Sequence, residues 1–464
     1  MRLVRSLVVI AFVLMSAQVV CAADGWIPFD GAAGEAATVS VVESDASHVV
    51  LRIDVPGLSA ESVETSGGKF TRLTLDGAGS ASVVGEALLP VVREFIEIPH
   101  GTDPVLTVAH SDYRRVALAD LGVTHALLPV QAPVEKIPGA LESARFEMSA
   151  AYYDSDVFSP SSAASLGEVQ TMRGHRFVQL EVSPVRYNPA RGEVEYATSI
   201  EVTVEFPGAD LAETRRVHDR YSNGRFAKLA SDTFINHAVF TTRYTTPLPI
   251  GYLIVCYDSF TDEIAPLAAW KEQKGYNTTV VSTADIPGGN TKENIKSYIQ
   301  DAYDNWSVPP TFVLLVGDTP QISHWVGTQS NSPSTDLYYT TMDGSSDWLP
   351  DIWIGRFSCS NASQVTNLVN KTVDYETWNL TSGTDWIKKA VFMASEDNYT
   401  VTEGTHDYVI RQYLDPAGYY SQRLYMHTYN ATTAQVSAAF NDGRSLGIYS
   451  GHGAITYWAD GPVF

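Results

Sequence analysis

The run Tyr252-Leu-Ile-Val-Cys256 is apolar throughout, and it is followed by a segment from Asp262 to Lys274 in which Ile264, Leu267 and Ala268 fall on one helical face. An apolar run without alternation is typical of a strand covered on both faces, as in parallel sheets. The same rhythm of strand and helix then repeats along the rest of the chain. Further strands are expected at residues 278–281, 311–316, 352–357, 390–394, 423–426 and 446–449, and helices at 291–303, 362–376, 406–414 and 433–441. This half therefore predicts an α/β domain with a mainly parallel sheet.

The first half of the chain has a different pattern. Segments such as His48–Val55, Arg176–Val182 and Ile200–Phe206 alternate apolar and polar residues, and turn-forming pairs such as Asn188-Pro189 lie between such segments. We expect residues 24–208 to form an all-β sandwich or barrel. This half carries no catalytic motif, so a β-rich adhesion or scaffolding module is the simplest interpretation of it alone.

Two further segments complete the domain plan. Residues 1–23 have the pattern of a secretory signal peptide, with Arg2 and Arg5 before an apolar run and Cys21-Ala22-Ala23 after it. A membrane anchor is the alternative, but the run is shorter than the roughly 20 residues that cross a bilayer, and no later stretch is long and apolar enough to do so. Residues 209–243 are polar and rich in arginine, and they predict a linker with exposed processing sites before a domain at residues 244–464.

The composition limits the class of partner. The chain has 464 residues and a formal net charge of −22, from 31 lysines and arginines against 53 aspartates and glutamates. Such a polyanion repels nucleic acid and anionic membranes, so neutral or basic partners are expected. Its three cysteines are too few for a disulfide scaffold and lack zinc-finger spacing.

The most informative motif is Leu446-Gly-Ile-Tyr-Ser-Gly-His-Gly453, where a strand runs directly into a histidine between two glycines. Glycine allows a sharp turn and a close approach of substrate, and imidazole titrates near neutral pH. His452 is therefore a catalytic candidate, and a turn histidine that only bonds neighbouring carbonyls is the alternative.

Acidic residues follow two other predicted strands, at Asp318 and at Glu396-Asp397. Functional groups of parallel sheets gather beyond the carboxyl ends of the strands, so these carboxylates are candidates to orient a histidine there. Acidic residues in such positions also cap helices or face solvent, and that reading stays open.

These motifs carry a resemblance. From Arg243 onward, the chain resembles the gingipain-type cysteine peptidases of family C25, which have a caspase-like fold. The matching stretches, in the family's order, are Arg243–Thr245, Thr311–Asp318, Ile354–Cys359, Ala394–Asp397 and Tyr449–Gly453. The β-rich half is similar to the family's propeptide at Gly85–Pro90 and Phe95–Pro99.

The resemblance implies a mechanism of acyl transfer by a thiolate. His452 gives a proton to the leaving amine, Asp397 orients the imidazole, and the amide of Gly453 helps to hold the oxyanion. The family's nucleophile is a cysteine that follows the Gly-His-Gly segment, and this sequence ends at Phe464 before reaching it. We therefore expect a precursor that is truncated at its C-terminus, with an incomplete α/β domain and no peptidase activity of its own.

The other cysteines do not replace that nucleophile. Cys256 lies on the first strand of the domain, and Cys359 matches a non-catalytic cysteine of the family, so both are expected to be small buried hydrophobic residues. A disulfide between them is an open alternative. Asp397 stands where arginine-specific relatives carry glutamate, and Ala454 replaces a common serine; neither change abolishes the mechanism.

The resemblance also suggests a specificity residue and an ion. In relatives, a buried acid after the orienting carboxylate selects basic side chains, and Glu403 is the best-aligned candidate, with Asp407 second. No cofactor is required. Calcium supports the fold in several relatives, and a loop with Asp336, Asp343, Asp347 and Asp351 offers oxygen ligands for a structural calcium ion, although not with EF-hand spacing.

The sequence thus predicts a secreted or cell-surface zymogen of a cysteine endopeptidase that acts on proteins or peptides, with its propeptide as an intramolecular inhibitor. One alternative is a non-enzymatic surface or adhesion protein with a caspase-like binding module. A serine or metal hydrolase is disfavoured because Gly-x-Ser-x-Gly and His-Glu-x-x-His are absent from the sequence.

Maturation gives the first prediction. Arg243-Tyr244 matches the point at which relatives release their propeptide, and exposed polar segments are where proteolysis concentrates. Amino-terminal sequencing of the secreted active form should begin at Tyr244, with Arg220 and Arg225 as competing sites. A start before residue 200, or active material that consists of one uncut chain, would contradict the zymogen interpretation.

Overall fold

The computed structural model describes residues 25–134, 143–240, 249–328, 332–378, 383–396, 399–453 and 458. The predicted signal peptide and the predicted cleavage site at Arg243-Tyr244 lie outside these residues. The chain divides into two compact units. The first unit comprises the residues up to Ala132 and Phe146–Thr366 and contains the β-rich part and one α/β sheet. The second unit comprises Pro133–Arg145 and the residues from Asn367 onward.

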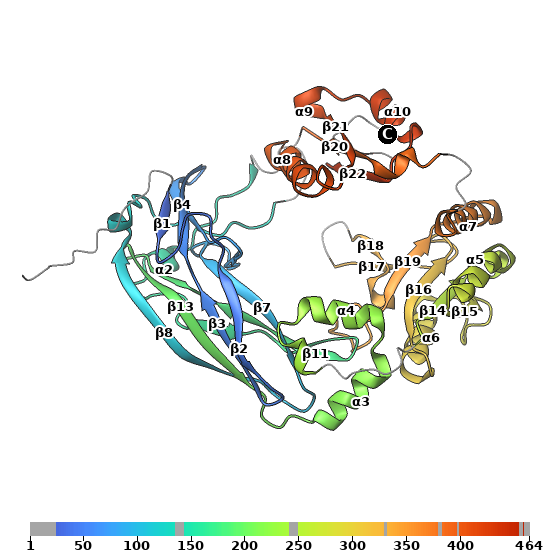
Figure 1. Cartoon of the computed structure of the whole chain (residues 1–464), viewed down its shortest axis with the longest axis horizontal. Coiled ribbons are helices and arrows are strands. Elements are labelled where there is room, and N and C mark those ends of the chain that lie inside the picture. The colour runs from blue at the N-terminus through green and yellow to red at the C-terminus, as the bar shows by residue number, and fades with distance from the viewer. Residues whose placement is uncertain are drawn as a thin grey trace, which may run out of the picture. The chain divides into compact units, whose positions relative to one another are not determined.

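The β-rich part of the first unit consists of antiparallel sheets, labelled in Figure 1. One sheet has the order β12-β13-β3-β2, with β8 also paired to β13; a second has the order β10-β11-β7-β6, with β9 paired to β11; and a third has the order β1-β4-β5. The strands are β1 (Trp26–Pro28), β2 (Thr38–Ser44), β3 (His48–Asp54), β4 (Gly57–Thr65), β5 (Gly68–Thr74), β6 (Gly79–Ser80), β7 (Pro90–Ile98), β8 (Val105–Ala117), β9 (Ala164–Leu166), β10 (Gln170–Met172), β11 (His175–Val182), β12 (Val185–Asn188) and β13 (Glu193–Glu205). Two short helices, η1 (Leu118–Leu121) and α2 (Ala150–Tyr153), lie between strands.

Alternation along these strands separates core from surface. In β3, the side chains of Val49, Leu51 and Ile53 are fully buried, while Arg52 between them is exposed. Strand β13 follows the same rule with Val202 and Val204. The period of two in the sequence therefore correctly predicted these strands.

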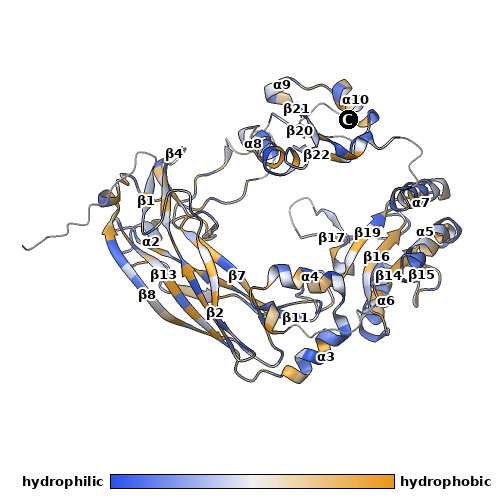
Figure 2. Ribbon diagram, viewed as in Figure 1, coloured by the Kyte–Doolittle hydropathy of each residue, from blue (hydrophilic) through white to orange (hydrophobic). Residues whose placement is uncertain are grey.

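The second part of the first unit is a parallel sheet of order β15-β14-β16-β19. Leu253, Ile254, Val255 and Cys256 of β14 are all fully buried, as a strand covered on both faces requires. Figure 2 shows the hydrophobic colour concentrated on β14 and β16. The elements are β14 (Gly251–Cys256), η3 (Asp258–Phe260), α5 (Thr261–Gln273), β15 (Asn277–Ser282), α6 (Lys292–Asn305), β16 (Pro310–Val316), β17 (Trp325–Val326), β18 (Ser334–Thr335), η4 (Leu337–Tyr339) and β19 (Trp353–Phe357). The boundary between the two units falls within the next helix, α7 (Ala362–Glu376).

The second unit contains its own parallel sheet, of order β21-β20-β22. The sequence predicted a mainly parallel sheet, and the parallel pairing is confirmed, but the single sheet was wrong because the later strands pair among themselves. An apolar run shows that a strand is covered, but it does not show which neighbour the strand takes. The elements are η5 (Asp385–Lys388), β20 (Lys389–Ala394), α8 (Tyr399–Val409), the π-helical turn η6 (Ile410–Leu414), β21 (Tyr420–Tyr425), α9 (Met426–Tyr429), α10 (Thr433–Asn441) and β22 (Leu446–Ser450).

The segment expected to be a linker contains helices α3 (Leu211–Tyr221) and α4 (Gly224–Thr233) and the short helix η2 (His237–Val239). Asp210 and Asn223 cap the first two helices by accepting bonds from backbone amides of the first turn. Phe226 and Ala230 are buried. Arg220, expected to be exposed, donates to carbonyls at the end of α6, among them that of Tyr303 at 3.0 Å.

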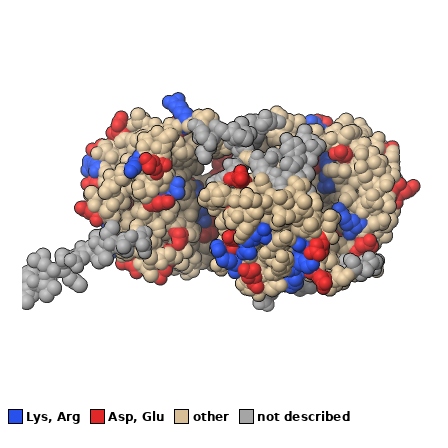
Figure 3. All heavy atoms as spheres, turned by 90° about the horizontal axis from the view of Figure 1, so that it is seen from above, with Lys and Arg blue, Asp and Glu red and all other residues tan. Residues whose placement is uncertain are grey.

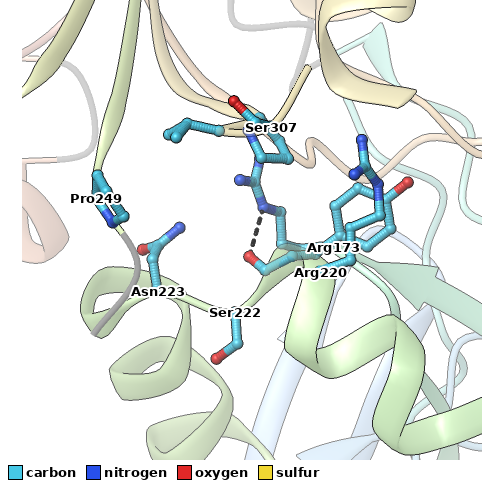
Figure 4. A pocket seen from close by; sticks show the side chains of 9 residues that line it. Arg173, Arg220, Ser222, Asn223, Pro249 and Ser307 are labelled. Carbon is cyan, nitrogen blue, oxygen red and sulfur yellow. Dashed lines mark hydrogen bonds between the residues drawn. The ribbon is translucent and has the colours of Figure 1, made fainter. Parts of the chain in front are cut away.

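Arg173 connects the β-rich part to the parallel sheet of the first unit. It occupies the turn between β10 and β11 with a positive φ of 51°, and its side chain is fully buried. Its guanidinium donates to the carbonyls of Tyr221, Pro310 and Asp351 at 3.2, 2.6 and 3.0 Å. Figure 4 shows Arg173 in a pocket between the helices α3 and α4 and the segments that carry Pro249 and Ser307.

Aromatic rings and a carboxylate complete this contact. The guanidinium lies 4.9 Å from the ring centre of Phe226 and 5.0 Å from that of Tyr303. The backbone amide of Arg173 donates to the carboxylate of Asp351. Burial lowers the pKa of Arg173, and the contacts offset only part of the cost of desolvating its charge.

Among the described residues, no helix is long and apolar enough to cross a bilayer. On the face drawn in Figure 3, acidic and basic side chains lie among one another.

Replacing Arg173 tests this connection. Arg173→Ala removes the donor for three buried carbonyls, each of which costs about 1–3 kcal/mol when left unpaired, so we expect the free energy of unfolding of the first unit to fall by at least about 3 kcal/mol. Urea unfolding measures the change. The control Arg216→Ala removes an exposed arginine paired with Glu213 and should cost less than about 1 kcal/mol. An equal loss of unfolding free energy in the two variants would show that the contacts of Arg173 stabilise the unit no more than an exposed ion pair does.

Candidate functional site

The carboxyl edge of the second sheet brings together three segments that lie apart in the sequence. In the parallel register, Ala394 of β20 stands beside Tyr425 of β21 and Ser450 of β22. The chain segments that follow these residues therefore leave the sheet at the same edge. They carry Glu396, Thr428 and His452.

A tyrosine holds the backbone of the histidine segment. The hydroxyl of Tyr449 donates to the carbonyl of His452 at 3.0 Å. The ring of Tyr449 stacks on Trp458, with ring centres 4.5 Å apart and planes 6° apart. Gly453 forms an isolated antiparallel bridge with Trp458. The histidine thus sits in a turn that is tied to β22.

Of the two glycines beside His452, only Gly451 lies where a larger residue would not fit. A Cβ at Gly451 would collide with the hydroxyl of Tyr449 and come within 3.0 Å of Ser395. A Cβ at Gly453 would meet no described atom within 4 Å. Gly451 therefore permits the close approach of Tyr449, whereas Gly453 has space beside its Cα.

The segment after β20 lies beside the histidine segment. The amide of Ser395 donates to the carbonyl of Ser450 at 2.9 Å, which continues the sheet pairing by one residue. Glu396 is exposed. Asp397, predicted to orient the imidazole, lies outside the described residues, so its approach to His452 stays a prediction.

Glu403 lies on α8, the helix that follows β20, and is 8% exposed. Its carboxylate accepts a bond from the amide of Thr428 at 3.2 Å and another from the hydroxyl of the same residue. Among the described residues, Glu403 forms no ion pair with a lysine or arginine. Asp407, one turn later, accepts from Arg423 at 2.8 Å and from Tyr425 at 3.0 Å, so its charge is already compensated.

Sequence reasoning missed a link between α8 and the histidine segment. The ring nitrogen Nε2 of His406 lies 2.8 Å from the hydroxyl of Ser450, two residues before His452. Burial lowers the pKa of His406, which favours its neutral form. The sequence indicated a helix here but started it at His406 itself, so the residue's inward orientation was not visible.

The two described cysteines are free thiols, so the disulfide alternative does not hold. Both side chains are buried. Burial raises the pKa of Cys256 to about 12 and also raises the pKa of Cys359. A nucleophilic cysteine needs a lowered pKa, so neither suits catalysis.

The acidic loop separates into two parts. Asp336 makes a two-pronged ion pair with Arg356, with distances of 2.7 and 2.8 Å. Asp343, Asp347 and Asp351 have carboxylate oxygens within 4.8 Å of one another. Burial and mutual repulsion raise the pKa of Asp343 to about 6 and that of Asp351 to about 7.

Asp318 follows β16 in the other sheet, so it shares no sheet edge with His452.

Comparison with known proteins gives consistent matches over most of the chain. Residues 32–242 match the C25 propeptide, and residues 245–464 match peptidase family C25. Lys-gingipain HG66 from Porphyromonas gingivalis is 30% identical over 413 residues, which cover 86% of this chain and 23% of that protein. Gingipain R2 from the same species is 25% identical over 427 residues, which cover 90% of this chain and 55% of that protein.

A solved structure concerning the zymogenic latency of gingipain K from Porphyromonas gingivalis is 26% identical, with a TM-score of 0.36, and the match covers 40% of this chain and 98% of that one. The chain spans about a quarter of the length of the Lys-gingipain and about half that of gingipain R2.

The two glycines make a matched pair for a test of the histidine turn. Gly451→Ala forces Tyr449 away from the carbonyl of His452 and should lower the free energy of unfolding of the second unit by about 1–3 kcal/mol. Gly453→Ala meets open space and should cost less than about 1 kcal/mol. Thermal unfolding compares them. A larger loss for Gly453→Ala would show that the turn is built differently.

Proposed function

Because this chain belongs to peptidase family C25 and carries the family's propeptide before its peptidase domain, we propose that it is the precursor of a secreted cysteine endopeptidase that cleaves proteins after basic residues. The observation that best supports the proposal is the position of His452, in a turn held by Tyr449 at the carboxyl edge of a parallel sheet. Imidazole in such a position can move a proton between a thiol, a substrate amine and water.

In the proposed reaction, a cysteine thiolate attacks the scissile carbonyl and the carbonyl oxygen becomes an oxyanion. His452 gives its proton to the leaving amine as the bond between carbon and nitrogen breaks, and it later removes a proton from the water that releases the acid product. The amide of Gly453 is the proposed donor to the oxyanion. Asp397, on the neighbouring segment, is the proposed partner of the imidazole.

Glu403 is the proposed specificity residue. Its carboxylate is nearly buried at the same sheet edge and has no cationic partner among the described residues, so a lysine or arginine side chain of a substrate would supply the missing charge. Asp407 is less suitable because Arg423 already pairs with it. The names Lys-gingipain and gingipain R of the relatives agree with a basic preference.

The propeptide is proposed to act as an intramolecular inhibitor. Its match extends to residue 242, and within the first unit its β10–β11 turn inserts Arg173 against the peptidase part. A contact of this kind keeps the propeptide in place even after a cut in the connecting segment, because the buried guanidinium contacts do not depend on chain continuity.

Calcium is proposed as a structural ion, with no catalytic role. Asp343, Asp347 and Asp351 offer converging carboxylate oxygens, the ligands that calcium prefers. Burial, and after it repulsion between these carboxylates, raises the pKa of Asp343 and Asp351, and a bound cation would favour their ionised forms. Asp336 is not included, because Arg356 occupies its carboxylate.

The adhesion-protein alternative is less favoured, because it gives no reason for a histidine turn, an uncompensated acid and a matching propeptide to occur together. The two proposals differ in whether any peptide bond is cut.

The test uses the protein expressed from its gene with the sequence downstream of Phe464 included, assayed on peptides with lysine, arginine or alanine before the cleaved bond. His452→Ala should lower kcat/KM by at least about 100-fold, because general acid–base catalysis contributes that much. Glu403→Gln should lower kcat/KM by about 10- to 100-fold for the basic peptides alone, since it removes one charge-assisted contact. Asp407→Asn is the control and should keep the preference for basic residues.

Cleavage that survives His452→Ala would remove this residue from the mechanism. Loss of the basic preference in Asp407→Asn but not in Glu403→Gln would transfer the specificity role to Asp407. Absence of cleavage by the processed wild-type protein would favour the binding-module alternative.

A further inference from the structure

A second cluster of ionisable side chains lies inside the propeptide part, in the first unit. It consists of Glu97 on β7, His175 on β11, His218 on α3 and His237 on η2. These residues are only 1%, 2%, 4% and 6% exposed. The cluster therefore joins two strands of a sheet to two helices of the segment that leads to the peptidase domain.

The three imidazoles converge on one carboxylate. Nδ1 of His175 lies 2.5 Å from Oε1 of Glu97, and Nδ1 of His237 lies 2.6 Å from Oε2. Nε2 of His218 lies 3.4 Å from Oε1. Asn236 holds the backbone of Glu97 on both sides, because it accepts from the amide at 2.8 Å and donates to the carbonyl at 2.9 Å. The carboxylate is thus fixed at the centre of the cluster.

Hydrogen bonding explains two of the histidines but not the third. Each oxygen of Glu97 already has a close imidazole partner, and His218 stands beyond strong hydrogen-bond distance. Its ring centre is 4.4 Å from that of His175. The lone pair of a buried neutral imidazole needs a hydrogen-bond donor or a metal ion, and a metal ion beside the carboxylate could take the lone pairs of all three rings.

The geometry agrees with metal binding. Glu97, His175 and His237 each offer one ligand atom, and these atoms all lie within 4.8 Å of one another. Nε2 of His218 lies 3.4 Å from the same carboxylate.

We propose that Glu97, His175, His218 and His237 form a site for a transition-metal ion of the zinc type. Three imidazole nitrogens and one carboxylate oxygen are a four-ligand set that zinc accepts in tetrahedral geometry, whereas calcium prefers oxygen ligands alone. Tetrahedral ligands at about 2.1 Å from zinc stand about 3.4 Å apart, which matches the 3.4 Å between Nε2 of His218 and Oε1 of Glu97. To reach the same spacing, the contacts of His175 and His237 with Glu97 lengthen by less than about 1 Å. Because Nδ1 of each of these two rings would bind the ion, its proton moves to Nε2.

Such an ion would fasten the helical segment to the β-rich sheet. His237 precedes the predicted cleavage site at Arg243-Tyr244 by six residues. A bound ion would therefore keep the end of the propeptide folded on its own sheet both before and after cleavage. This role goes beyond the proposed peptidase activity and does not depend on it.

The experiment measures zinc binding by the 464-residue chain. After dialysis against a chelator, isothermal titration with zinc chloride should give one site per chain, and the thermal midpoint of unfolding should rise with zinc. Cobalt should give the visible absorption of a tetrahedral nitrogen and oxygen site. His218→Gln and His237→Gln should each weaken zinc binding by at least about 100-fold, more than the loss of an outer-shell contact.

The exposed group of Glu43, Asp45 and His48 supplies a matched control, because it also brings a histidine and two carboxylates together. His48→Gln should leave the stoichiometry and affinity unchanged. Circular dichroism shows whether each variant is folded. If a variant does not fold, the number of zinc ions bound by the wild-type chain still tests the proposal. Binding of no zinc by the wild-type chain, or binding lost in His48→Gln and kept in His218→Gln, would overturn the proposal, as would a site that calcium fills equally well.

Discussion

The parallel pairing of β20 with both β21 and β22 is the constraint on which the candidate active site depends. Because all three strands run in the same direction, the segments after Ala394, Tyr425 and Ser450 leave the sheet at one edge. An antiparallel partner would send one of them to the opposite edge and separate Glu403 and Thr428 from the histidine. Two local contacts then position the histidine segment at this edge. Tyr449 donates to the carbonyl of His452, and His406 links α8 to Ser450.

Buried charge connects the propeptide part of the first unit to its neighbours. Arg173 and the cluster around Glu97 are both almost fully buried, and each has its polar contacts made by elements on either side of a junction. Such groups are costly to bury alone, so they specify how the elements meet more than they add stability. Polar contacts therefore join the β-rich sheets to helices α3 and α4 and to the first parallel sheet. These contacts are directional, so they fix the orientation of the elements more strictly than apolar contacts would.

Strands and helices could largely be predicted from the sequence, because burial on one or both faces leaves a periodic record, as in β3 and β14. The Gly-His-Gly turn was also visible, since its first glycine directly follows a predicted strand, although that strand, β22, is only partly buried. The division into two sheets was not, because strand partners are chosen by tertiary packing. The helices of residues 211–233 were missed because their charged faces resemble a linker when the few buried residues, such as Phe226, are not yet known to meet a partner. Arg173 gave no signal at all, because an arginine in a turn ordinarily faces solvent.

The central claim is that His452 serves a cysteine nucleophile in an enzyme that accepts basic side chains. Labelling the processed enzyme with a lysyl or arginyl chloromethyl ketone, followed by mass-spectrometric mapping, tests this most directly. The reagent alkylates a thiolate held beside the bound basic side chain, with loss of chloride. The account predicts a single adduct on a cysteine that lies C-terminal to Gly453. An adduct on Cys256, on Cys359 or on a serine, or no adduct on an enzyme that is active, would contradict it.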